Sequence, residues 1–146
     1  MDSDIKRMIY LDSIQYSLSS IYFKQLDNIS DDYGINITNE IKPKSISENG
    51  FTLKAIRNVF LQPKGGFELS IEYELICLFK QESKDFYNGN INEIEKFIEK
   101  RKIEIFNSSD VGNRMSILIS QITLAFNNNP IVLPPYINLN SKKQNQ

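Results

Sequence analysis

Hydrophobic and polar residues alternate with a period of two along the first half of the chain. In residues 14–23 the apolar positions follow this period from Ile14 to Leu18, and the alternation resumes out of phase at Ile21. A β-bulge near Ser19 and Ser20 would produce this shift, because it inserts one extra residue into a strand. The pattern therefore predicts one bent strand over residues 14–23.

A second and a third strand are predicted on either side of a hairpin turn. The segment that begins at Tyr33 alternates with the same period, and residues 51–62 are rich in β-branched and aromatic side chains. Asn49-Gly50 lies between the two segments. This dipeptide is a strong hairpin signal, because both residue types tolerate positive φ.

A fourth strand follows the next reversal, which the sequence PKGG at residues 63–66 predicts. In residues 67–79 apolar side chains occupy the odd positions, whereas Glu68, Glu72 and Glu74 lie among the even ones. This strand is predicted to have one buried face and one wet, acidic face.

The period changes to that of a helix in the second half of the chain. Residues 90–106, NINEIEKFIEKRKIEIF, place apolar residues three and four positions apart with charged residues between them, which predicts an amphipathic helix. NSSD at residues 107–110 supplies capping residues for a second helix over residues 111–126, whose apolar stripe is wide enough to be covered on more than one side. Three asparagines and Pro130 end that helix.

Strands followed by helices predict one α+β domain over residues 1–146, with a four-stranded antiparallel sheet followed by two helices. A chain of 146 residues has the size of one ordinary domain and can bury a core without disulfides. The polar residues from about 141 to 146 are expected to form a disordered tail.

The composition argues against several classes of function. Histidine, the commonest general base near neutral pH and the commonest metal ligand, is absent, so zinc sites and Ser-His or Cys-His catalysis are not expected. The single cysteine, Cys77, lies in the apolar run ELICLF, where a buried reduced thiol is expected rather than a reactive one. No glycine-rich segment matches a phosphate-binding loop, and no cofactor is predicted.

Charge and hydropathy do not predict a nucleic-acid or membrane partner. Hydrophobic residues make up 40% and charged residues 24% of the chain, and its net charge is -1. The basic run at residues 100–102 lies among Glu95, Glu99 and Glu104, which favours a solvated helix face over a phosphate-binding patch. No apolar run is long enough to span a bilayer and the first residues do not form a signal peptide, so a cytoplasmic location is expected.

Two segments resemble the SecB protein-export chaperone family. Residues 119–138, ISQITLAFNNNPIVLPPYIN, resemble the part of that family in which the long helix gives way to a proline-rich connection. Residues 14–24, IQYSLSSIYFK, resemble the family's opening strand, and the order of strands and helices also fits. The matching positions in the first segment are Ile119, Thr123, Pro130, Val132, Leu133, Pro134, Pro135 and Asn138.

The resemblance implies a chaperone that holds unfolded or precursor polypeptides without ATP. Prolines would keep the apolar segment VLPPYI from pairing as a strand, and aromatic residues would supply contact area that tolerates many client sequences. By this resemblance, client would lie in a groove between the end of the first strand and the proline-rich segment. The residues predicted to bind client are Tyr22, Phe23, Leu26, Tyr33, Ile131, Leu133, Pro134 and Tyr136.

The resemblance also implies a homo-oligomer, a tetramer built as a dimer of dimers through the first strand and the long helix. The residues predicted for the oligomer interface are Ile14, Tyr16, Leu18, Met115, Leu118, Ile119 and Ile122.

Two departures from the family bear on partners. Residues 111–116 read VGNRMS where family members often have Leu-Phe-Pro-Tyr-Leu-Arg, so the start of the helix is expected to pack differently. Familiar members also have a second helix and, in some, a zinc-binding tail that engages the SecA motor, whereas this chain has no histidine and one cysteine. No zinc is therefore expected, and any SecA contact would use the acidic face of Glu68, Glu72 and Glu74. A dedicated client such as an antitoxin is an alternative to export.

A non-chaperone oligomeric interaction or structural subunit is the alternative function, because it would use the same apolar surfaces. An enzyme is not predicted. The carboxylates of Glu68, Glu72 and Glu74 lie close together along one strand, but a charged outer face explains them without catalysis.

Overall fold

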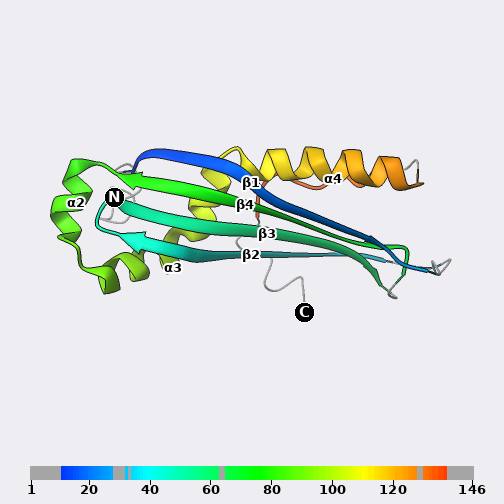
Figure 1. The fold of residues 1–146 in the computed structure, drawn as a ribbon, viewed down its shortest axis with the longest axis horizontal. Helices are drawn as coiled ribbons and strands as arrows, with labels where there is room; N and C mark the ends of the chain where they lie inside the picture. Colours follow the sequence, from blue (N-terminus) through cyan, green and yellow to red (C-terminus); the bar gives the residue numbers. More distant parts are fainter. Residues whose placement is uncertain (1–10, 28–31, 33, 63–64, 128–129, 138–146) are drawn as a thin grey trace.

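The computed structural model of the chain describes residues 11–27, 32, 34–62, 65–127 and 130–137. In these residues four strands precede three helices, so the predicted α+β class is confirmed (Figure 1). The predicted polar tail at residues 141–146 lies outside the described residues. The elements are β1 (Leu11–Gln25), β2 (Gly34–Ser47), β3 (Gly50–Gln62), β4 (Phe67–Phe79), α2 (Gln81–Tyr87), α3 (Ile91–Ser108) and α4 (Val111–Asn127).

Besides the two predicted helices, the described residues form one short helix that was not predicted, α2. This helix has seven residues, of which Ser83 and Tyr87 are buried. Two inward positions four residues apart are too few to establish a helical period. α2 ends in an αL cap, in which Asn88 has a φ of 47° and its N–H donates to the Lys84 carbonyl. Asparagine is one of the residue types that favour such a cap.

The four strands form one antiparallel sheet in the order β1-β4-β3-β2. β2, β3 and β4 pair as two successive hairpins, the first of which turns between Ser47 and Gly50, as predicted. β1 pairs with β4, from Leu11 opposite Phe79 to Gln25 opposite Phe67. β1 and β2 are therefore the edges of the sheet, and they are long, at 15 and 14 residues.

A β-bulge in β1 sets which of its side chains face the helices. The register with β4 shifts between Leu18 and Ser20, where the alternation predicts a bulge. Leu18 is opposite Tyr73 before the shift, and Ile21 is opposite Ile71 after it. Both partners lie on the buried face of β4, so the bulge returns the apolar side chains of β1 to that face.

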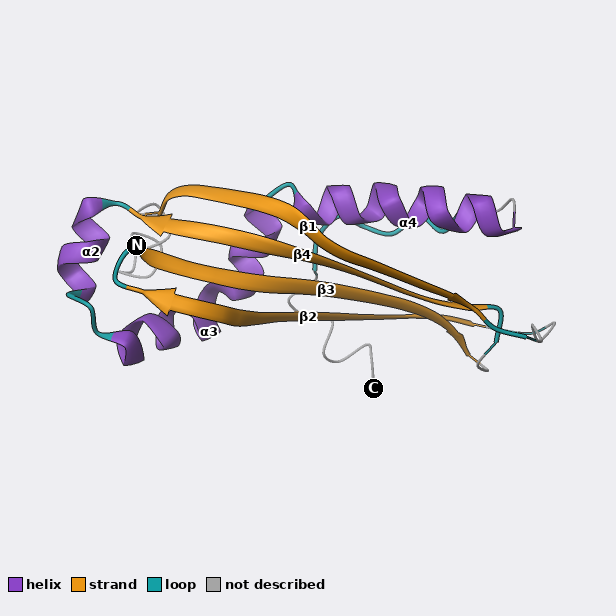
Figure 2. Cartoon of the chain, in the orientation of Figure 1, coloured by secondary structure: helices purple, strands orange, loops and turns teal. Residues whose placement is uncertain are grey.

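The core lies between one face of the sheet and the two longer helices (Figure 2). The odd-numbered residues of β4 are buried, which confirms the alternation predicted for that strand, and those of β3 are buried as well. α3 and α4 begin and end within two residues of their predicted bounds. Their most buried apolar side chains are Ile94, Ile98, Ile105, Phe106, Val111, Met115 and Ile119.

The opposite face of the sheet carries charges of both signs rather than a purely acidic surface. Lys44 Nζ lies 2.7 Å from a carboxylate oxygen of Glu74, and Lys24 is opposite Glu68 in the register of β1 and β4. Exposed ion pairs of this kind add little stability, because both ions are already well solvated. A SecA contact through Glu68, Glu72 and Glu74 stays a prediction.

Cys77 is expected to resist thiol reagents in the folded chain. Its side chain is fully buried in β4, and burial raises the pKa of the thiol to about 12. The reactive thiolate is therefore suppressed at pH 8, and alkylation should require unfolding. The rate of alkylation at pH 8, measured with and without denaturant, checks this expectation. Equal rates would contradict the buried position of the thiol.

Candidate functional site

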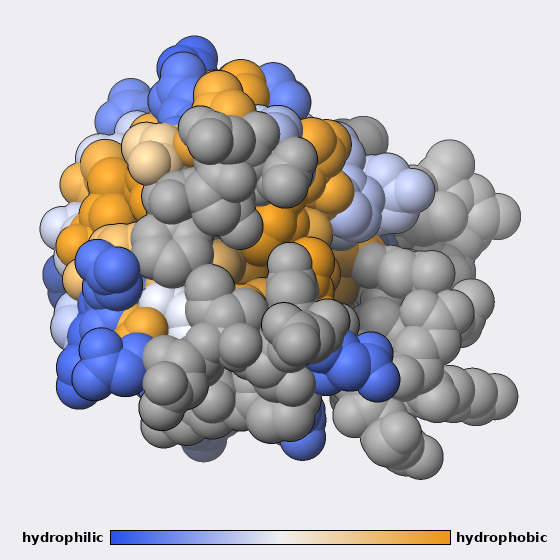
Figure 3. All heavy atoms as spheres, turned by 90° about the vertical axis from the view of Figure 1, so that its right-hand side faces the viewer, coloured by the Kyte–Doolittle hydropathy of each residue, from blue (hydrophilic) through white to orange (hydrophobic). Residues whose placement is uncertain are grey.

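The apolar face of the sheet is only partly covered along its β1 edge. Leu18, Ile21 and Phe23 lie on the helix-facing side, yet they are 44%, 43% and 38% exposed. We call these three residues the β1 edge cluster. Figure 3 looks at the end of the molecule toward which β1 runs and shows hydrophobic residues gathered among hydrophilic ones. Apolar side chains grouped on a surface are typical of sites that bind another polypeptide.

Tyr22 and Phe23, both predicted to bind client, point to opposite faces of the sheet. Phe23 is opposite Leu69 and stacks on Phe67, with ring centroids 5.8 Å apart. Tyr22 is opposite Ser70 and lines a hollow of about 570 Å³ on the outer face, together with amide and hydroxyl side chains of β2, β3 and β4. The structure therefore does not bring these two side chains into one groove.

The proline-rich segment at residues 130–137, which we call the ribbon, lies against the helices. Leu133 and Ile137 are each 8% exposed, whereas Val132 and Tyr136 are 77% and 56% exposed. Prolines remove backbone donors, so the ribbon does not pair as a regular strand, and side chains hold it instead. The ribbon therefore has a buried, anchored side with Leu133 and Ile137. Its exposed side, which we call the presented side, carries Val132 and Tyr136.

Both ends of the ribbon are held by side chains of the helices. Thr123 Oγ1 accepts a hydrogen bond from the N–H of Ile131 (2.7 Å) and donates to the Ile119 carbonyl within α4 (2.7 Å). Asn107 makes two bonds to Ile137: its Oδ1 accepts from the backbone N–H (2.7 Å), and its Nδ2 donates to the carbonyl (2.9 Å). Thr123 is fully buried, so its bonds also satisfy a polar group in the core.

The middle of the ribbon crosses the start of α4. Arg57 Nη1 donates to the Pro134 carbonyl (3.0 Å), and Ser116 Oγ donates to the same oxygen (3.3 Å). Gly112 makes the crossing possible, because a Cβ at that position would collide with the Pro135 carbonyl oxygen. Position 112 therefore requires glycine as long as the ribbon keeps this path.

The other residues predicted to bind client differ in their accessibility. Leu26 and Ile131 are half-buried, and Tyr33 lies outside the described residues. Pro134 is exposed, whereas the side chain of Leu133 is in the core. Sequence reasoning did not predict Val132 as a client residue, although the ribbon presents it most fully. The client-binding role of the set stays a prediction.

The residues predicted for an oligomer interface divide between surface and core. Met115 and Ile119 are 1% and 0% exposed and belong to the core of the chain itself, so they are not available to a second copy. α4 also carries Ile117 and Leu124, which are 48% and 49% exposed and were not predicted. The remaining predicted members are partly or fully accessible: Ile14, Tyr16, Leu18, Leu118 and Ile122.

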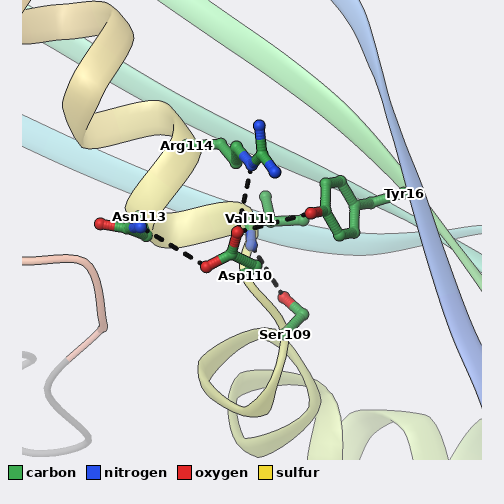
Figure 4. A network of polar contacts seen from close by, with 6 residues as sticks. All are labelled: Tyr16, Ser109, Asp110, Val111, Asn113 and Arg114. Carbon is green, nitrogen blue, oxygen red and sulfur yellow. Dashed lines mark hydrogen bonds and ion pairs between the residues drawn. The ribbon is translucent and has the colours of Figure 1, made fainter.

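A polar cluster at the start of α4 connects this helix to β1 (Figure 4). Asp110 Oδ2 accepts from Arg114 Nε (3.1 Å) and from the Tyr16 hydroxyl (3.4 Å). Arg114 also lies over the Tyr16 ring, 5.8 Å from its centroid, and the hydrogen bond to Asp110 raises the pKa of Arg114. Ser109 Oγ accepts from the N–H of Val111 (3.3 Å), in keeping with the predicted capping segment.

Neither a metal centre nor a membrane span is found in the part of the chain that the structure describes. There, no three acidic or cysteine side chains come together in a way that could hold a metal ion. No helix in the same residues combines the length and the apolar character needed to cross a membrane. The candidate site consists of exposed apolar surface, namely the β1 edge cluster and the presented side of the ribbon.

No protein-family model matches the sequence, and no curated protein matches it either. The fold is similar to that of a solved structure, the Mycobacterium tuberculosis Rv1957 SecB-like chaperone in complex with a ChAD peptide from the Rv1956 HigA1 antitoxin. The TM-score is 0.53 at 10% sequence identity, and the match covers 88% of this chain and 93% of the other. At this identity the likeness is one of fold, and the chain has a SecB-like fold.

Proposed function

We propose that the protein is an ATP-independent holdase that binds unfolded segments of other polypeptides. The observation that carries the proposal is the β1 edge cluster, whose three apolar side chains are 38–44% exposed on a face that is otherwise largely buried. A client segment laid along this edge would bury apolar surface, which stabilises a complex by about 25 cal/mol per Å². It could also pair with the edge of β1 as an added strand.

The SecB-like fold supports this proposal at the level of architecture. Rv1957 has a similar fold and was solved in complex with an antitoxin peptide, so such a fold is compatible with a bound peptide. We propose that the clients are unfolded or precursor polypeptides, held either for export or in a dedicated role such as the protection of an antitoxin. A contact with SecA belongs to the export role alone.

The proposed active form is a homotetramer that brings together α4 and the first part of β1, with Ile14 and Tyr16, of neighbouring copies, so that Ile21 and Phe23 stay open to client. α4 supports this assembly because Ile117 and Leu124 are about half exposed beside the half-buried Leu118 and Ile122. The outer face of a surface helix in a monomer is normally polar. Linked client sites would raise the effective concentration of each site for a long client, so weak contacts would add up.

Ile21→Lys is expected to remove most of the holding activity while the chain stays folded. The side chain of Ile21 is 43% exposed, so a lysine there can keep its ammonium group in water, yet the apolar contact with client is lost. Ser20→Lys is the matched control, because it adds the same charge one residue away on the outer face, opposite Glu72.

The measurement is light scattering from an unrelated, chemically unfolded protein diluted into buffer without nucleotide. The parent and Ser20→Lys should suppress its aggregation, and Ile21→Lys should not. A parent that fails to suppress aggregation would refute the holdase function. Equal suppression by Ile21→Lys and the parent would remove the β1 edge cluster from the client site.

An oligomeric interaction or structural subunit is the alternative, because other copies of the chain could cover the same apolar residues permanently. The exposed residues Ile117 and Leu124 of α4 are compatible with either function. A photo-crosslinking amino acid at Phe23 discriminates the two. It should crosslink to an unfolded client if the protein is a chaperone, and to other copies alone if the protein is a structural subunit.

A further inference from the structure

We propose that Arg57 is a positioning residue that holds the ribbon in the orientation that presents Val132 and Tyr136 to client. This inference rests on the holdase function proposed above. Arg57 interrupts the apolar face of β3, where its neighbours on the same face are Ala55 and Val59. The arginine is 2% exposed, so it does not serve as a surface charge.

Arg57 connects three parts of the chain that are far apart in sequence. Its Nε donates to Asn39 Oδ1 in β2 (2.7 Å). Its Nη1 donates to the Pro134 carbonyl in the ribbon (3.0 Å) and to Ser116 Oγ in α4 (3.4 Å). A guanidinium suits this junction, because its donors are fixed in direction by a planar group.

Stability alone does not account for an arginine at this position. Its three acceptors are neutral, and burial lowers the pKa of Arg57 to about 10, which reflects the cost of taking a cation out of water. Buried ionic groups can often be replaced by apolar residues without loss of stability. An apolar residue would not supply a directional bond to the ribbon, and this bond is what Arg57 adds.

The bond to Pro134 fixes which side of the ribbon faces solvent. Pro134 and the proline after it have no N–H, so the middle of the ribbon can be held through a carbonyl oxygen but not through a backbone donor. With that oxygen turned toward Arg57 and Ser116, the flanking side chains of Val132 and Tyr136 are 77% and 56% exposed. Rotation of the ribbon about its own axis would break the bond and turn these side chains away from solvent.

Arg57→Met tests the proposal, because it preserves the length of the side chain and removes its donors. Ribbon position is read from a nitroxide spin label on Val132→Cys, and the buried thiol of Cys77 keeps the labelling specific. We expect a more mobile label in Arg57→Met than in the parent, both without client. In the unlabelled proteins we expect the affinity for unfolded client to fall about five-fold. This factor corresponds to the free energy of one net hydrogen bond.

Lys54→Met is the matched control. It also exchanges a cation for methionine on β3, but Lys54 is on the outer face, opposite Glu74, so parent-like results are expected. Parent-like label mobility and parent-like holding in Arg57→Met would overturn the proposal.

If Arg57→Met does not fold, the same two measurements are made on Arg57→Lys, because lysine retains the charge but lacks the fixed geometry of the guanidinium donors. A more mobile label with weaker holding then supports the proposal, and a parent-like spectrum overturns it. Label mobility is measured without client, so it tests the position of the ribbon even if the parent holds no client. In that case the holdase function fails on separate grounds.

Discussion

Replacing Ile119 by glutamate is expected to unfold the chain, whereas Leu118→Glu is expected to leave it folded and to dissociate its oligomer. Ile119 is 0% exposed in the core. An unpaired carboxylate there would cost about 4 kcal/mol or more, a large share of the stability of a typical domain. Leu118 is half-buried at the surface of α4. A glutamate there keeps its contact with water in a single copy and loses it only against a second copy.

Melting followed by circular dichroism and mass from light scattering separate the two effects. Gln121→Glu is the control, because it adds a carboxylate at an exposed position of the same helix. A cooperative, parent-like melt of Ile119→Glu would contradict its place in the core. An unchanged mass of Leu118→Glu would place the interface elsewhere, and a parent mass near 16.9 kDa, that of one chain, would refute the proposed tetramer.

The paired substitution Val132→Ser with Tyr136→Ser is expected to reduce holding about ten-fold, because client would lose apolar contact worth about 1.4 kcal/mol. Melting should stay unchanged, since the two side chains are 77% and 56% exposed and contribute little to the core. The measurement compares the suppression of aggregation by parent and variant, after oligomer mass and melting have been shown to agree.

Leu133→Ser serves as the contrasting variant. Leu133 is 8% exposed, and its loss should lower the free energy of unfolding by about 2–4 kcal/mol. Weaker holding by Leu133→Ser would therefore reflect damage to the fold. If the paired variant stays folded and assembled and holds clients as well as the parent does, the ribbon serves packing alone.

The strands of the sheet could be predicted because their signals are local. The phase shift after Leu18 predicts the bulge, and Asn49-Gly50 predicts the turn between β2 and β3. The order of the strands could not be predicted in this way. The alternation in β1 shows which side chains share a face, but it does not say that β4 rather than β2 is its partner.

The sequence does not show which residues of the wide apolar stripe of α4 belong to the core. Ile119 and Leu118 are both apolar and fit the helical period, and only the packing of α4 against the sheet assigns Ile119 to the core. Arg57 did carry a signal, because a cation occupies a position where the period of β3 predicts an apolar residue. The sequence does not indicate which residues accept hydrogen bonds from Arg57, since Ser116 and Pro134 lie 59 and 77 residues further along the chain.

β1 is synthesised before the other three strands but can pair only after β4 exists. Its ladder joins Gln25 to Phe67 and Leu11 to Phe79, so a loop of about 40 residues must close before the first pair forms. The other three strands can form as successive hairpins from local contacts, which is faster than long-range pairing. We therefore expect a folding chain in which the three-stranded meander is complete while β1 is still extended and unpaired. The last step of folding is then the capture of an extended apolar segment by an open sheet edge, and that segment is β1 of the same chain.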